Sequence, residues 1–119
     1  MATIDESLNS LMTVNGAMAA ALVDYNSGML LGSVGSGLDL EIAAAGNTEV
    51  VRAKMKTIKM LKLNQDIEDM LITLSTQLHL IRPLNTDRDL FIYYVIDASS
   101  GNLALARRAL KQIESSIIV

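Results

Sequence analysis

Three glycines in the segment LLGSVGSGLDLE, residues 30–41, have a spacing that could hold a phosphate group. Gly32, Gly35 and Gly37 follow an apolar run and precede a helical pattern, which is where glycine-rich phosphate loops occur. Their spacing, however, reverses the dinucleotide pattern G-x-G-x-x-G, and no G-K-S/T ending follows. The strand before them fits one arm of a hairpin, so no crossover helix would point at a ligand. We therefore expect these glycines to end the strand, bend the chain and start the helix, without a nucleotide or other cofactor.

The only histidine, His79, stands between Leu78 and Leu80 in an alternating strand pattern. A catalytic or metal-bound histidine needs a partner, and the sequence offers no His-x-x-His or Glu-x-x-His pair. We therefore predict a structural or solvent-facing histidine and no metal site. Arg107 and Arg108 could act as arginine fingers on a GTPase, but two surface arginines on a helix explain them more simply.

The acidic residues show no catalytic arrangement either. The neighbouring pairs Asp5/Glu6 and Glu68/Asp69 are typical of a helix start and of an edge strand, and no G-x-S-x-G elbow is present. No catalytic residue is assigned, and we expect the protein not to be an enzyme.

A short pattern, V/I-D-x-x-S-G-x-L, occurs twice, at residues 23–30 and 96–103. Two metal or phosphate loops would require a second acidic residue near each aspartate, and none is there. The pattern therefore predicts two strand exits in which Asp and Gly make the same bend.

The composition indicates one folded domain, residues 1–119. Half of the residues are apolar, 19% are charged, no cysteine is present and the net charge is −3. These values argue against disorder, thiol chemistry and nucleic-acid binding. No apolar run is long enough to insert into a membrane, and the acidic start does not resemble a signal peptide, so we expect a cytoplasmic protein. The mean hydropathy of +0.34 leaves surplus apolar surface, which favours association with another subunit.

The periodicity of apolar residues predicts three helices and five strands in the order α-β-β-α-β-β-β-α. The first helix begins with a Thr3/Glu6 capping box, and the last begins at Asn102. We expect the seven apolar residues 90–96 to form the central strand of an antiparallel sheet. The remaining elements are strands at 17–24, 29–33, 67–74 and 77–84, and a long helix at 39–62.

The two longer helices have recognisable faces. In the long helix, Gly46 costs about 1 kcal/mol relative to Ala and marks either a close-packing point or a break. Its basic residues gather toward the C-terminal end: Lys54, Lys56, Lys59 and Lys62. In the last helix the predicted solvent side carries Arg107, Arg108, Lys111 and Glu114.

This order, with these motifs in place, resembles the bacterial branch of the roadblock/dynein light-chain family. The segments that carry the resemblance are AMAAALVDYNSGMLLGSVG, DIEDMLITLSTQLHLIRPL and FIYYVIDASSGNLALARRAL, together with the long helix from Asp39. The resemblance extends from about Ile4 to Ile117 and rests on order and spacing, because no single motif is diagnostic. It implies an α+β, profilin-like domain: a five-stranded antiparallel sheet with helices on both faces.

The resemblance also implies a homodimer. In the family, the strand that corresponds to residues 67–74 lies at the sheet edge and pairs with its copy, while the long helices pack together. A bare edge strand of this composition would invite such pairing. The candidate interface residues are Leu40, Ala43, Val51, Met55 and Ile58 on the helix, and Ile67, Asp69, Leu71 and Thr73 on the strand.

Family members are non-enzymatic platforms, and many bind Ras-like small GTPases on the two-helix face. The resemblance therefore implies that this chain binds and regulates such a GTPase, either activating or localising it. Lys54, Lys56 and Lys59 are the candidate partner contacts, although a solvated helix face explains them equally well. The alternative function is a motor light chain or scaffold adaptor without a GTPase partner.

Overall fold

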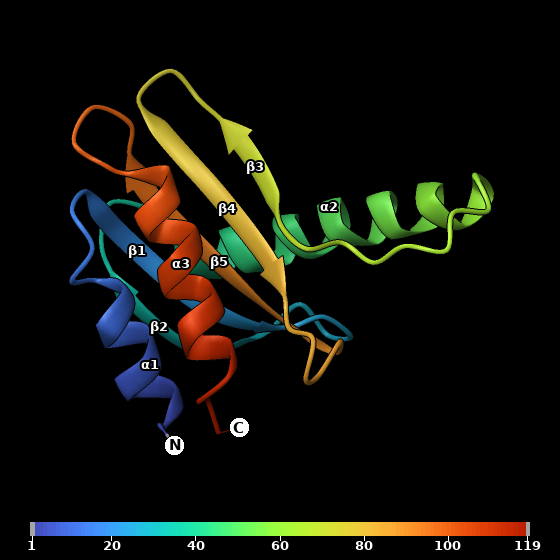
Figure 1. Cartoon of the computed structure of the whole chain (residues 1–119), viewed down its shortest axis with the longest axis horizontal. Helices are drawn as coiled ribbons and strands as arrows, with labels where there is room; N and C mark the ends of the chain where they lie inside the picture. The colour runs from blue at the N-terminus through green and yellow to red at the C-terminus, as the bar shows by residue number, and fades with distance from the viewer. Residues whose placement is uncertain (1, 119) are drawn as a thin grey trace.

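The computed structural model describes residues 2–118 as one antiparallel sheet with helices on both faces (Figure 1). The strand order is β2-β1-β5-β4-β3, so β5 is central and β2 and β3 are the edges. Helices α1 and α3 cover one face and α2 covers the other. The elements are α1 (Ile4–Leu11), β1 (Ala17–Asp24), β2 (Leu30–Gly35), α2 (Leu40–Met60), β3 (Met70–Thr73), β4 (Gln77–Pro83), β5 (Leu90–Asp97) and α3 (Leu103–Glu114). The predicted fold class, element order and central strand are confirmed.

The central strand β5 supplies both halves of the core. Tyr94 lies on the side of α1 and α3, where its hydroxyl donates to the Leu11 carbonyl at 2.5 Å. Burial raises the pKa of Tyr94 to about 12. Tyr93 points to the opposite face, toward α2, with Phe91 and Val95. Because β5 is buried on both sides, the core is divided into two clusters by the sheet.

Strand β1 packs against β5 through small side chains, as its sequence predicts, with one difference at its start. Ala20 and Leu22 face α1 and α3, whereas Ala19 faces α2. In a regular strand Met18 would share a face with Ala20, two residues away, yet it packs with the α2 cluster. The reason is a shift in the pairing with β5 between Ala17 and Ala19, which interrupts the alternation of side chains.

The helix starts agree with the sequence. Thr3 and Glu6 form the predicted capping box, and their hydrogen bonds lower the pKa of the Glu6 carboxyl. Asp39 accepts hydrogen bonds from two backbone amides at the start of α2, and Asn102 accepts one from Leu105 at the start of α3. These side chains satisfy donors that the helices leave free at their N-termini.

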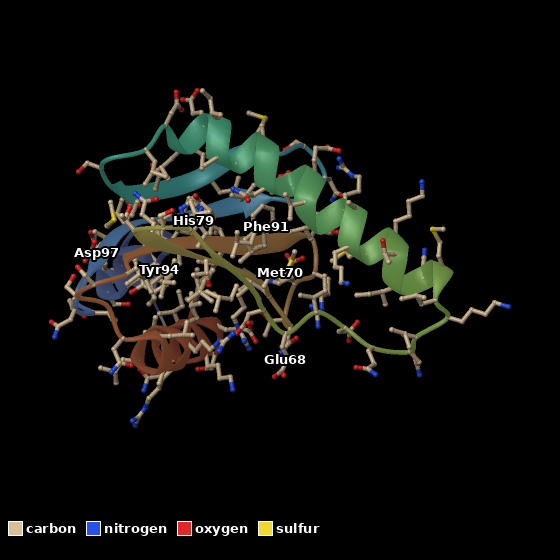
Figure 2. The ribbon with its side chains drawn as sticks, turned by 90° about the horizontal axis from the view of Figure 1, so that it is seen from above. Glu68, Met70, His79, Phe91, Tyr94 and Asp97 are labelled. Atoms are coloured by element: carbon tan, nitrogen blue, oxygen red, sulfur yellow. The ribbon has the colours of Figure 1, made fainter. Side chains whose placement is uncertain are left out.

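Helix α2 is longer than the part of the sheet that it covers. Its N-terminal half lies over β1 and β2, whereas its C-terminal half extends beyond the sheet (Figures 1 and 2). Gly46 neither breaks the helix nor packs closely, because no atom lies within 4 Å of the position its Cβ would occupy. In residues 2–118, no helix is long and apolar enough to cross a membrane.

Two sequence expectations are wrong near β3 and α3. The strand expected at residues 67–74 is only Met70–Thr73, so Ile67 and Asp69 lie before it. Glu114 was expected in solvent, yet it is buried beneath α3 and accepts a hydrogen bond from buried Arg82, with Nε–Oε2 at 3.0 Å. The helical pattern could not show that β4 places a guanidinium directly under this carboxylate.

Gly35 ends β2, as expected for the glycines of this segment, whereas Gly32 lies within the strand. A Cβ on Gly32 would lie 2.7 Å from Ile4 Cγ2, so this glycine lets α1 approach β2 closely. Gly35 has φ +91°, a conformation that other residues rarely adopt.

The variant Gly35→Val should unfold far more easily than the parent protein. Its Cβ would lie 2.2 Å from the Met18 carbonyl oxygen, a backbone atom that cannot easily move, at a strained φ. We expect the free energy of unfolding to fall by more than about 3 kcal/mol, measured by urea denaturation. The control Gly46→Ala adds a methyl group in open space and should raise it by about 1 kcal/mol. Equal stability of Gly35→Val and the parent would contradict the requirement for glycine at position 35.

Candidate protein interaction surface

The edge strand β3 pairs with a neighbour on one side only. Its four residues pair with β4, from Met70 opposite Ile81 to Thr73 opposite Leu78. No other strand of the described chain follows β3 in the sheet, so its outer backbone groups remain available. An exposed edge of this kind can pair with a strand from another molecule.

The side chains of β3 point alternately to the two faces of the sheet. Leu71 packs toward the α1/α3 cluster, and Met70 packs toward the α2 cluster. Ile72 lies opposite His79 and is 36% exposed, and Leu74 just beyond the strand is exposed as well. An apolar edge therefore accompanies the free backbone groups.

The second apolar area is the far end of α2. Met60 is 72% exposed and Leu61 is 61% exposed, and Leu63 just after them is exposed too. We call the segment 52–63 the α2 tip. It holds five basic residues, and no acidic residue occurs from 50 to 65. The tip is therefore both strongly basic and apolar on a chain whose net charge is negative.

A cavity of about 600 Å³ lies between the α2 tip and the segment that returns from it to β3. Met55, Ile58 and Leu63 provide apolar lining, and Lys56 and Lys59 provide basic lining. The apolar part of this lining suits an apolar side chain of a partner.

The candidate interface residues on α2 are mostly engaged within the chain itself. Val51 is fully buried in the α2 cluster, so its side chain is not available to a second molecule. Leu40, Ala43 and Met55 are half-buried and pack against the same cluster. Ile58 is half-buried and lines the cavity. The apolar stripe seen in the sequence is therefore chiefly the face that covers this chain's own sheet.

The candidate residues around β3 divide in the same way. Ile67 is buried, and Asp69 forms an ion pair with Arg107. Leu71 and Thr73 lie on the strand, and Thr73 is exposed. The pattern overlooked Leu74 and the apolar end of α2, because these residues lie outside both stripes. The sequence does contain a signal for the end of α2, because three apolar residues at 60, 61 and 63 stand beside basic neighbours.

The partner contacts suggested by the sequence, Lys54, Lys56 and Lys59, are all exposed on the α2 tip. They belong to the C-terminal half of α2, and this half of the helix extends beyond the sheet (Figure 2). Their charges are therefore available to a partner, although nothing in the monomer requires them to bind one.

His79 has a structural environment, as its isolation in the sequence predicts. Its Nε2–H donates to Gln77 Oε1 at 2.9 Å, and its Nδ1 accepts from the Tyr93 hydroxyl at 2.9 Å. Burial lowers the pKa of this histidine, which favours the neutral ring. Both ring nitrogens are thus occupied within the sheet face that α2 partly covers (Figure 2).

The two repeated loops are strand exits, as predicted. Asp24 accepts from Asn26 N and Ser27 Oγ, and Asp97 accepts from Ser99 and Ser100. The serine hydrogen bonds lower the pKa of the Asp97 carboxyl. Among residues 2–118, no group of three or more metal-ligating side chains comes together.

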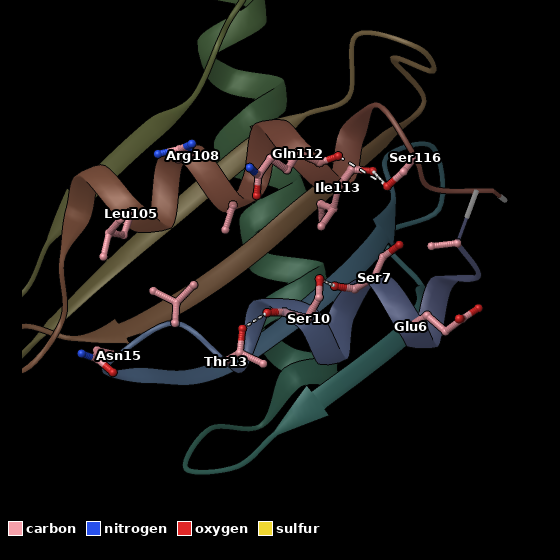
Figure 3. A pocket seen from close by; sticks show the side chains of 13 residues that line it. Glu6, Ser7, Ser10, Thr13, Asn15, Leu105, Arg108, Gln112, Ile113 and Ser116 are labelled. Carbon is pink, nitrogen blue, oxygen red and sulfur yellow. Dashed lines mark hydrogen bonds between the residues drawn. The ribbon is translucent and has the colours of Figure 1, made fainter.

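A polar groove of about 710 Å³ separates α1 from α3 (Figure 3). Hydroxyl and amide side chains provide much of its lining, including Ser10 and Gln112. Ser7 Oγ is buried there without a hydrogen-bond partner.

No protein-family model and no curated protein sequence matches this chain. Solved structures do resemble it. A roadblock/LC7 domain from Streptomyces avermitilis superimposes with a TM-score of 0.83, at 13% identity, covering 97% of this chain and 94% of the other. Myxococcus xanthus MglB gives a TM-score of 0.80 at 18% identity, with 92% and 86% covered. An MglB protein in a tetrameric arrangement gives 0.81 at 15% identity, with 94% and 82% covered. The chain therefore has the roadblock/LC7 fold, which confirms the resemblance seen in the order and spacing of its elements.

Proposed function

We propose that this chain is a non-enzymatic, homodimeric interaction platform that binds and regulates a Ras-like small GTPase in the cytoplasm. The observation that carries the proposal is the free edge of β3, together with the separate, uncovered α2 tip, in a roadblock fold. Both features are surfaces for other proteins.

Pairing of β3 with β3 of a second copy accounts for the open edge and its apolar side chains. The two sheets would join into one, and Ile72 and Leu74 would be covered near the contact. Antiparallel pairing of identical strands gives a two-fold interface, the commonest symmetry of homo-oligomers. The tetrameric arrangement of a structurally similar MglB supports association as a property that this fold can have.

The α2 tip is the proposed contact for the GTPase. Half of the ten basic residues of the chain lie within this one segment, so its local charge opposes the negative net charge of the whole. Such a surface attracts an acidic partner and accelerates its association. The roadblock resemblance indicates that this partner is a Ras-like GTPase.

Ile72→Lys should weaken the dimer without unfolding the monomer. Ile72 is partly exposed in the single chain, so lysine can extend into solvent there, whereas strand pairing would bury its charge. We expect the dimer dissociation constant, measured by sedimentation equilibrium, to rise at least about tenfold. The control Ser33→Lys places the same charge on β2, the other edge strand, and should leave the constant unchanged. A parent protein that is monomeric at high concentration would contradict the homodimer.

The triple variant Lys54→Gln, Lys56→Gln, Lys59→Gln should bind the GTPase more slowly. Loss of three positive charges from the α2 tip removes electrostatic attraction, so we expect the association rate constant at low salt to fall at least about tenfold. Ras-like GTPases from the same genome, loaded with GDP or a GTP analogue, are the partners to measure. The rate of GTP hydrolysis distinguishes activation from localisation.

The matched control makes an equal change in net charge elsewhere. Asn9→Asp, Thr13→Glu and Gln112→Glu add three negative charges on exposed positions around α1 and α3. This control should bind like the parent protein. Equal loss of binding in both triple variants would show a non-specific charge effect. Failure of every Ras-like GTPase to bind the parent, with recovery of motor or scaffold components only, would favour the adaptor function.

A further inference from the structure

The four residues that precede β3 are held by arginines from three separate parts of the fold. The chain runs back from the α2 tip toward the sheet, and residues 66–69 are the last four residues before β3. Arg82 reaches it from β4, Arg88 from the loop between β4 and β5, and Arg107 from α3. Arg82 contacts Glu68 and Arg107 contacts Asp69. Arg88 contacts two residues, Asp66 and Ile67.

The ion pair of Arg107 with Asp69 is the contact nearest to β3. Arg107 Nε lies 2.9 Å from Asp69 Oδ2, and Arg107 Nη2 lies 3.1 Å from Oδ1. Two parallel hydrogen bonds fix the orientation of the carboxylate as well as its position. Asp69 directly precedes Met70, so this pair lies at the start of the edge strand.

The other two arginines bind backbone carbonyls. Arg82 is buried and held by Glu114, and its Nη1 donates to the Glu68 carbonyl at 3.4 Å. Arg88 Nη1 donates to the Ile67 carbonyl at 3.1 Å. Arg88 Nη2 also lies 3.5 Å from Asp66 Oδ2. Carbonyl groups of a segment outside any strand thus find donors on β4 and on the loop between β4 and β5. Figure 2 shows Glu68 beside Met70.

Apart from the buried side chain of Ile67, these contacts are the support that the structure gives to the segment before β3. Residues 61–66 are exposed, and β3 itself has only four paired residues at the edge of the sheet. Fixing each backbone residue costs about 1–2 kcal/mol of conformational entropy, so a short edge strand with a loose approach would fray.

We propose that Arg107, Arg82 and Arg88 are positioning residues for self-association: they hold segment 66–69 so that β3 is ordered before a second copy pairs with it. The inference rests on the proposed homodimer. The arginines do not themselves form the strand pairing. They lower the ordering cost that pairing would otherwise incur, which is the general benefit of a preorganised binding segment.

The contact of Arg107 with Asp69 is the one to alter, because both side chains lie outside the two core clusters. Arg107→Met keeps the length of the side chain, and Asp69→Asn keeps its shape. We expect each variant to raise the dimer dissociation constant at least about tenfold, or about 1.4 kcal/mol, in sedimentation equilibrium. Amide hydrogen exchange at residues 70–73 should become faster in the monomer, while the circular dichroism spectrum stays that of the parent.

A control and a rescue separate positioning from a general loss of charge or stability. Arg108→Met removes the exposed neighbouring charge on α3 and should leave the dimer unchanged. The double variant Asp69→Arg, Arg107→Glu restores an ion pair with reversed charges and should recover most of the lost affinity. Parent-like dimers of Arg107→Met and Asp69→Asn would overturn the inference, as would equal weakening by Arg108→Met. A monomeric parent would instead refute the homodimer on which the inference rests.

Discussion

Strand β5 presents aromatic and aliphatic side chains to both faces of the sheet, so both faces must be covered for the chain to fold. This constraint places β5 in the centre and requires helices on each side. It also explains the small side chains of β1, because alanines beside β5 let covering elements approach closely. Tyr94 links this strand to one of the covering helices, since its hydroxyl donates a hydrogen bond to the Leu11 carbonyl of α1.

Coverage of the two faces is unequal, and the inequality generates the interaction surface. Helices α1 and α3 together cover one face, whereas α2 alone covers the other. Since α2 crosses the sheet near β1 and β2 and then continues past it, the opposite edge near Ile72 is left partly open. The same helix that completes the core therefore also exposes an apolar, basic end. Core coverage in the single chain and an exposed apolar, basic surface thus arise from one element.

Sequence patterns predicted those elements whose side-chain periodicity is set locally. The capping box at Thr3 and the buried run of β5 depend on residues close together in the chain, and both were confirmed. The start of β3 could not be predicted, because Asp69 continues the alternating pattern although Arg107 holds it outside the strand. The predicted exposure of Glu114 was wrong for the same reason, because its partner, Arg82, comes from β4. On α2, the apolar stripe that contains Val51 could be predicted from the sequence. The sequence did not show whether the sheet of this chain or a second copy would cover that stripe.

The charged residues that escaped prediction share a physical feature that bears on function. Their partners lie far away in sequence, and they surround β3, one of the two edge strands of the sheet. Apolar burial determines which face each side chain of this four-residue strand takes, but it is not directional and does not orient the segment that leads into the strand. Bidentate ion pairs are directional, and a geometry set by Arg107 and Asp69 supplies what burial lacks. In this chain the hydrophobic pattern determines the fold, and the ion pairs determine how its free edge is presented.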